Sequence, residues 1–290
     1  MDSVIRSLYQ EQASNPATLG VLLIEGCEKN FFSPDFFDTL LFVITNTGKK
    51  DLDIKYYSYN EKILALYLID EKQLNEWLIS GTNKKIFYWI LNGKPLFDRN
   101  DFLNRLLREL KDFPFHERKL KIGLEFAKLI REYTEGRRFY ESKQYFDAYI
   151  HTLHSLHYLA RLALIEKGYH PEVSLWKQVK TVEPEIYKMY DELINSKESL
   201  EKRIELLFLA SEFFIHKRTE IGTTHLLEIL REKPYWSLQD VMEHPELKLY
   251  ASDLAILLEY LVEKGYLNIC LEQSKRKHLF HRYYTVKNNM

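Results

Sequence analysis

Residues 40–45, with the sequence LLFVIT, limit the fold of this chain more than any other feature. Every position from Leu40 to Ile44 is apolar, so the segment lacks the alternation that a strand with one wet face shows. An apolar run of this kind is typical of a strand that is covered on both faces. We therefore expect a central strand with further layers on both sides of its sheet.

The segments around this strand predict an α/β arrangement for residues 1–112, within a chain whose class as a whole is predicted to be α+β. Strands and helices follow one another at a spacing that favours a small mixed sheet backed by helices. The expected strands are residues 19–24, 55–59, 63–69 and 86–91, and the expected helices are residues 3–12, 71–79 and a segment that begins near residue 101.

The rest of the chain predicts two further domains. Residues 113–217 predict an all-α bundle, because apolar residues recur there every three or four residues. Examples are the segments 120–133, 145–167 and 200–215. Residues 218–290 predict three helices and then a β-hairpin. The first helix spans 219–231, the second begins at the N-cap sequence SLQD, and the third spans 252–264. Three helices followed by a hairpin are the order of a winged helix-turn-helix.

Composition excludes several classes of protein. The 41 basic and 42 acidic side chains nearly cancel, so no overall field attracts nucleic acid or a membrane. Two cysteines are too few for a disulfide framework. The apolar runs of about five residues are far shorter than the roughly 20 residues that span a bilayer. We expect a cytoplasmic protein without membrane contact.

Two carboxylates, Asp35 and Asp38, stand just before the central strand and after the turn at Gly26 and Cys27. A separation of three residues would place them on opposite faces of a strand. They are candidate catalytic residues, or else cap and turn residues of the SPD loop. Glu25 precedes the glycine and faces the same pocket if the turn forms. Asp98 is interpreted as a turn residue or as the cap of the next helix.

These segments resemble a known family. The pieces LLIEGC, SPDFFDTLLFVIT and GKPLFDR are similar to the glycine turn, the acid-headed strand and the closing strand of nucleotidyltransferases. The segment HSLHYLARLALIEKGYHPEVSLWKQV resembles the substrate-binding bundle of aminoglycoside-type nucleotidyltransferases. With the winged helix, the whole order resembles the YgxA-type nucleotidyltransferase-like proteins of bacilli.

The resemblance implies a site for a nucleoside triphosphate. The glycine turn of the family cradles phosphates, and a pair of carboxylates on the next strand holds Mg²⁺. In an active site Asp38 would bind Mg²⁺, and without activity no cofactor is expected. The implied nucleotide-binding residues are Glu25, Gly26, Cys27, His157 and Arg161.

The chain departs from the active pattern of the family. The second metal-ligand position falls on Thr39 or Leu40, and the third carboxylate is expected near Leu64 or Ala65. Our main expectation is therefore a degenerate transferase site that still binds a nucleotide. An active Mg²⁺-dependent enzyme that moves a nucleoside monophosphate onto a hydroxyl group is the first alternative, and a nucleic-acid-binding regulator is the second.

Histidines recur every three residues at His151, His154 and His157. This spacing lets only neighbouring pairs share one face of a helix, which disfavours a three-histidine zinc site. His157 and Arg161 are one turn apart and are interpreted either as the wall of a phosphate-binding cleft or as hydrogen-bonding residues of the core.

The predicted wing of the C-terminal domain is basic. Its cations form a candidate phosphate-contact strip of Lys275, Arg276, Lys277 and Arg282. The preceding helix, SDLAILLEYLVEK, lacks the Arg, Asn and Gln side chains that read base edges. Nucleic-acid contact through the wing and protein contact, including a homodimer, both stay open.

Overall fold

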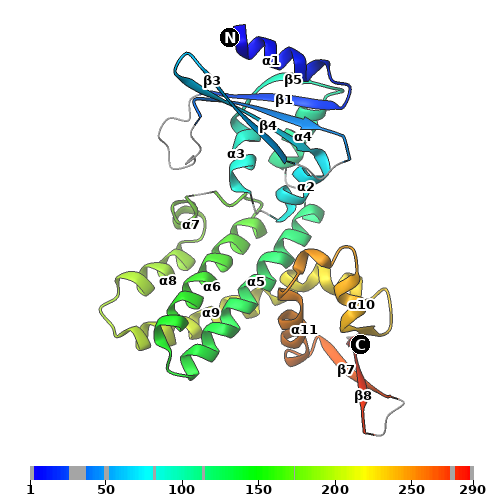
Figure 1. Cartoon of the computed structure of the whole chain (residues 1–290). Helices are drawn as coiled ribbons and strands as arrows, with labels where there is room; N and C mark the ends of the chain where they lie inside the picture. The colour runs from blue at the N-terminus through cyan, green and yellow to red at the C-terminus, as the bar shows by residue number, and fades with distance from the viewer. Residues whose placement is uncertain are drawn as a thin grey trace. The chain divides into compact units, whose positions relative to one another are not determined.

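The computed structural model describes residues 3–25, 37–48, 52–80, 83–112, 115–172, 174–274 and 278–287. The chain divides into two compact units, residues 1–114 and residues 115–290 (Figure 1). The first unit holds a mixed sheet with helices. The second holds long helices and a small sheet, so the predicted α+β class is confirmed.

The first unit is built on a five-stranded sheet with the order β3-β4-β2-β1-β5. Strands β2 and β4 are parallel, and the other neighbours are antiparallel. The elements are α1 (Ser3–Ser14), β1 (Thr18–Glu25), β2 (Thr39–Thr45), β3 (Leu52–Tyr59), β4 (Lys62–Asp70), α2 (Glu71–Ser80), α3 (Lys84–Asn92), β5 (Lys94–Asp98) and α4 (Phe102–Asp112).

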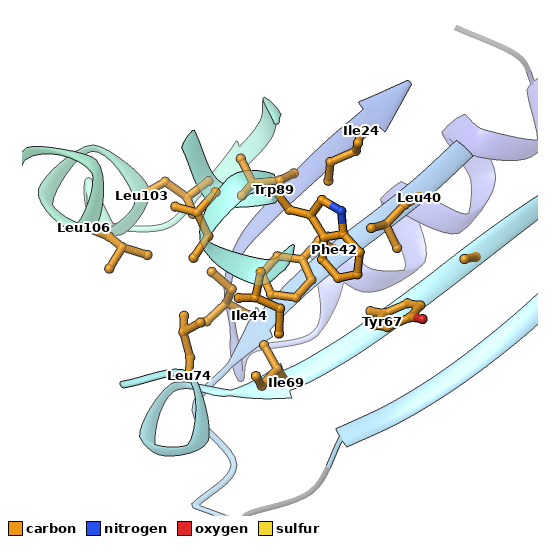
Figure 2. Packing of buried hydrophobic residues seen from close by; sticks show 14 of the residues in the cluster. Ile24, Leu40, Phe42, Ile44, Tyr67, Ile69, Leu74, Trp89, Leu103 and Leu106 are labelled. Atoms are coloured by element: carbon orange, nitrogen blue, oxygen red, sulfur yellow. The ribbon is translucent and has the colours of Figure 1, made fainter. Parts of the chain in front are cut away.

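Strand β2 is covered on both faces, as its apolar run predicts. Residues 40–44 are all 0% exposed. One face packs against α2, α3 and α4 through side chains such as Leu74, Trp89 and Leu103 (Figure 2). The opposite face, which includes Leu41 and Val43, packs against helix α1. We call these the three-helix face and the α1 face of the sheet.

The prediction of a strand at residues 86–91 is wrong, because this segment belongs to helix α3. Its buried side chains are Ile86, Trp89 and Ile90, so the spacings are three residues and then one. This spacing places them on one side of a helix, the side that faces the sheet. The side chain of Asn83 caps the helix by accepting a hydrogen bond from the Ile86 amide at 3.4 Å. The closing strand follows as β5, within the segment GKPLFDR that the family resemblance indicated.

The second unit begins with long helices and ends in a winged helix whose three-stranded sheet has the order β6-β8-β7. None of the helices in the described part of the chain combines the length and apolar composition needed to cross a membrane. The elements are α5 (Phe115–Glu141), α6 (Tyr145–Glu166), α7 (Leu175–Val182), α8 (Pro184–Asn195), α9 (Leu200–Leu230), β6 (Trp236–Ser237), α10 (Leu238–Glu243), the 3₁₀ helix η1 (Lys248–Tyr250), α11 (Asp253–Glu263), β7 (Leu267–Gln273) and β8 (Phe280–Val286).

Helix α9 crosses the expected junction between bundle and winged helix without a break. The prediction of two separate helices at 200–215 and 219–231 is wrong, since the 31 residues of α9 form one helix. The segment contains no proline, and its one glycine, Gly222, lies where helix α5 approaches closely. A Cβ atom at Gly222 would stand 2.4 Å from Cγ of Phe126. Bundle and winged helix therefore share a structural element.

Helix α11, the recognition helix by its position in the winged helix, is packed against α5. Arg131 of α5 forms an ion pair with Asp253, which is 6% exposed. The Phe126 and Tyr260 rings lie 5.9 Å apart, and the Tyr260 hydroxyl is 2.8 Å from that of Thr219 in α9. One side of α11 is thus occupied by the bundle.

We predict that Arg131→Met destabilises the second unit by about 2–3 kcal/mol, because it leaves the carboxylate of Asp253 buried without its counterion. Urea unfolding followed by circular dichroism measures the loss. Burial raises the pKa of Asp253 above its ordinary value of 3.8, although Arg131 opposes the shift. The variant raises this pKa further, so its deficit is largest at neutral pH and shrinks as the pH falls towards 3.8 and the carboxyl becomes neutral.

Arg138→Met is the matched control, because Arg138 lies on the same helix and pairs with Glu135 at the exposed surface. We expect a change within about 0.5 kcal/mol for this control. Equal losses for the two variants would contradict the role given to the Arg131–Asp253 pair.

Candidate functional site

Asp38 lies at the mouth of the sheet, where β2 begins beside β4. Its side chain is exposed, and one carboxylate oxygen, Oδ2, accepts a hydrogen bond from the Ile63 amide at 2.7 Å. The Asp38 amide donates in turn to the Ile63 carbonyl at 2.8 Å. Asp38 therefore closes the end of the β2–β4 pair and also presents a carboxylate to solvent. The other expected site residues on this loop, Gly26, Cys27 and Asp35, lie outside the described residues.

The strand register shows which side chains surround this mouth. Glu25, Thr39 and Leu64 face one another across β1, β2 and β4. These three side chains point to the same side of the sheet as the buried residues of the α1 face, which lie two positions away along each strand. The row therefore stands at the end of that face. Glu25 is exposed and Thr39 is half-buried, whereas Leu64 is 5% exposed. Glu25 is the only acid of this row.

The next row lies on the three-helix face and contains Leu40 opposite Ala65, both 0% exposed. They belong to the same core cluster as Phe37, Tyr67 and Trp89. The Trp89 ring stands 6.2 Å from that of Phe37. The same ring stands 5.2 Å from that of Tyr67 (Figure 2). Aromatic rings thus fill the space beside the two positions.

This arrangement decides what the mouth of the sheet can bind. Both rows considered for the second and third carboxylates hold apolar or uncharged side chains on β2 and β4. A carboxylate in place of Leu40 would lose its hydration without gaining a charged partner. In the described ranges, no three His, Cys, Asp or Glu side chains form a group that would hold a metal ion.

Two further carboxylates of the first unit accept hydrogen bonds from backbone amides. Asp98 accepts hydrogen bonds from the amides of Leu103 at 2.9 Å and Asn104 at 3.3 Å, which confirms its role as a cap of helix α4. Asp70 accepts from the amides of Thr47, Gly48 and Lys72. Burial alone would raise the pKa of Asp70, but these amides outweigh it and hold the pKa below its ordinary value. Both carboxylates therefore have structural roles as hydrogen-bond acceptors for the backbone.

Arg161 of the bundle is committed to a buried ion pair. Its Nε and Nη2 atoms lie 2.9 and 2.7 Å from the two carboxylate oxygens of Glu125 in helix α5. Arg161 is 8% exposed and Glu125 is 3% exposed. The structure therefore supports the hydrogen-bonding role in the core that the sequence left open for Arg161. His157 is half-buried, with its ring 5.8 Å from that of Tyr158.

The two neighbouring histidines of α6 converge on a residue that the sequence did not single out. Oε2 of Glu132 lies 2.8 Å from Nδ1 of His151 and 3.5 Å from Nδ1 of His154. Oε1 of the same carboxylate lies 2.9 Å from Nη2 of Arg131. Burial alone would raise the pKa of Glu132, but His151 and Arg131 hold it below its ordinary value. This cluster joins α5 and α6 and, through Arg131, helix α11.

The wing contributes a second internal pairing. Arg282 of β8 donates two hydrogen bonds to the carboxylate of Glu259 in α11, at 2.7 and 2.8 Å. The Tyr284 hydroxyl donates to the same carboxylate at 3.0 Å. The charge of Arg282 is thus compensated within the domain. The remaining cations of the expected phosphate strip, Lys275, Arg276 and Lys277, lie outside the described residues.

We predict that Leu40→Asp destabilises the first unit by about 3–5 kcal/mol, because it places a charge in the aromatic core. Leu40→Met, which conserves volume and polarity, should cost less than about 1.5 kcal/mol. Urea unfolding of both variants checks the difference. A Leu40→Asp protein that folds normally and gains Mg²⁺ binding would show instead that this position opens onto a metal site.

Three family models match the chain in succession. They are Nucleotidyltransferase-like over residues 1–118, YgxA-like substrate binding domain over residues 119–218 and Helix-turn-helix domain over residues 224–286. This is the order of parts that the sequence resemblance predicted. No pair of models overlaps, and together they account for most of the chain.

Relatives match the whole chain. It is 46% identical over 287 residues to "Uncharacterized protein YgxA" of Bacillus subtilis (strain 168), which covers 99% of this chain and 98% of the relative. The crystal structure of a nucleotidyltransferase-like protein from Exiguobacterium sibiricum 255-15 is 35% identical and matches with a TM-score of 0.85 over 97% of each chain. The chain belongs to the YgxA family of nucleotidyltransferase-like proteins.

Proposed function

We propose that this protein binds a nucleoside triphosphate at the mouth of its sheet without transferring the nucleotide. One observation carries the proposal. The family resemblance implies a second carboxylate at Thr39 or Leu40 and a third near Leu64 or Ala65. The parallel register of β2 and β4 sets these positions side by side, and none of them carries a charge. These positions on β2 and β4 therefore offer no acidic group to match the second and third carboxylates that the resemblance implies.

The chemical consequence is largest for the attacking hydroxyl group. In the active pattern the third carboxylate removes a proton from the acceptor, and a general base of this kind contributes roughly 10²–10⁴-fold to a rate. The first two carboxylates position Mg²⁺, which stabilises charge that develops on the phosphates. Asp38 alone can help to hold a metal that is already bound to phosphates, but no acid on β4 faces it to serve as the base.

Nucleotide binding itself needs neither missing acid. The family's glycine turn holds phosphates through backbone amides, and the sequence Glu25-Gly26-Cys27 keeps the glycine of that motif, with Cys27 where the family has Ser or Gly. Glu25 is the last residue of β1 and is exposed beside Thr39, so Gly26 follows in the sequence directly after the mouth of the sheet. We infer a ligand held by its phosphates, and a cytoplasmic location in keeping with such a ligand.

Calorimetric titration with ATP, GTP, CTP and UTP, in Mg²⁺ and then in EDTA, tests this function. We expect at least one nucleotide to bind with an affinity that EDTA and Asp38→Ala change less than about threefold, because backbone amides carry the binding. We expect Gly26→Val to abolish it. An assay for released pyrophosphate should stay at the background level. Affinity that requires Mg²⁺ and is lost in Asp38→Ala would contradict the proposal, as would no binding of any nucleotide.

The wing supports a second candidate function, sequence-independent contact with nucleic acid. Helix α11 is packed on α5 and its carboxylate Glu259 holds Arg282, so base reading by this helix is disfavoured. The cations Lys275, Arg276 and Lys277 follow β7 in the sequence after Ser274, and they form a continuous run of positive charge. Contact with phosphates through them would be electrostatic and would weaken with salt.

For this candidate we predict a mobility shift of double-stranded DNA or RNA at low salt that is lost when Lys275, Arg276 and Lys277 are replaced by Ala together. Arg282→Ala is the matched control and should leave the shift unchanged, because Glu259 already compensates that charge. An absent shift at low salt, or equal loss in both variants, would remove the wing as a phosphate-contact strip.

A further inference from the structure

The two edges of the five-stranded sheet differ in how they are protected from pairing with another chain. Edge strand β5 has five residues, includes Pro95 and has a register shift against β1. Edge strand β3 has eight residues, no proline, and an unbroken register with β4 from Leu52 to Tyr59. Shortness, proline and bulges are three of the features that keep edges apart. Strand β5 has them and strand β3 lacks them.

Strand β3 also exposes an apolar strip. Leu52, Ile54 and Tyr56 are 38%, 39% and 55% exposed, and Ile63 of β4 beside them is 37% exposed. They continue the three-helix face, since Ile54 pairs with the core residue Tyr67 and Tyr56 with Ala65. The apolar three-helix face thus continues onto β3, where no described helix covers its side chains. An apolar edge of this kind favours association.

The opposite face of β3 carries complementary charges. Asp53 and Lys55 alternate with the apolar strip and lie 3.1 Å apart, each with about half of its side chain exposed (53% and 52%). Apart from this one aspartate and one lysine, the described strand carries no charged side chain. Any strand that pairs with β3 will face this acid and this base two positions apart.

We propose that β3 pairs antiparallel with β3 of a second copy of this chain, so that two five-stranded sheets become continuous across a two-fold axis. Facing residues must point to the same side of a sheet, so two-fold symmetry allows only registers in which one residue faces its own copy. With Ile54 at that centre, Asp53 faces Lys55 of the second copy, and Lys55 faces its Asp53. Leu52 then faces Tyr56 of the second copy.

The neighbouring registers lack this complementarity. Centring on Asp53 or on Lys55 would place two like charges opposite each other, which is unfavourable across a strand pair. Centring on Tyr56 would set Asp53 against Tyr59 and Lys55 against Tyr57, without a charge pair. The Ile54 register alone among these joins two opposite-charge pairs on one face with a continuous apolar strip on the other.

Charge reversal of the full-length chain tests the proposal by sedimentation equilibrium. The wild type should be a dimer, and Asp53→Lys or Lys55→Asp should each raise the dissociation constant about tenfold or more, because two attractive pairs become repulsive. The double variant Asp53→Lys/Lys55→Asp restores both pairs and should return the constant to near the wild-type value. A pair that acts only within one chain would change unfolding and leave the mass unchanged.

Disulfide cross-linking tests the register. In a Cys27→Ser/Cys270→Ser background, Ile54→Cys should form a covalent dimer on oxidation, since facing Cα atoms of an antiparallel pair lie at about 4.5–5.5 Å. Tyr56→Cys should not, because its own copy would lie four residues along the strand, about 13 Å away. A monomeric wild type at high concentration, no rescue in the double variant, or cross-linking through Tyr56→Cys would each overturn the proposal.

Discussion

The parallel pairing of β2 with β4 is the constraint on which the rest of the first unit depends. It aligns Thr39 with Leu64 and Leu40 with Ala65, and each further pair up to Thr45 and Asp70 follows from that start. Because the strands are pleated, one row supplies the three-helix face and the next supplies the α1 face. The same register that completes two apolar layers therefore fixes which side chains stand at the mouth, where a transferase would hold its metal.

Parts of this arrangement could be predicted from the sequence because they depend on local patterns. The apolar run of β2 indicated its central place, and Asp98 indicated a helix cap. The segment 86–91 was misassigned because a short apolar run does not distinguish a strand from a helix that faces the core. The unbroken helix α9 was missed because side-chain periodicity does not show where consecutive helices join. The Arg161–Glu125 pair spans 36 positions and leaves no local signal.

The second unit shows how a winged helix can become part of a larger body. Helix α9 belongs to both parts, and α11 is held on α5 by the ion pair of Asp253 with Arg131. Arg131 also contacts Glu132, which lies beside His151 of α6. The recognition helix is thus joined to two helices of the bundle through charged side chains. This packing favours a role in assembly or in contact through the wing over the reading of bases.

We propose that the mouth of the sheet does not hold a metal ion of its own. Titration with Mn²⁺, followed by electron paramagnetic resonance of the free ion with and without a nucleoside triphosphate, tests it directly. We expect the protein to remove no more Mn²⁺ from solution than the nucleotide does alone, since the paired positions on β2 and β4 provide no carboxylate ligands. Stoichiometric binding of Mn²⁺ that disappears in Asp38→Ala would contradict it.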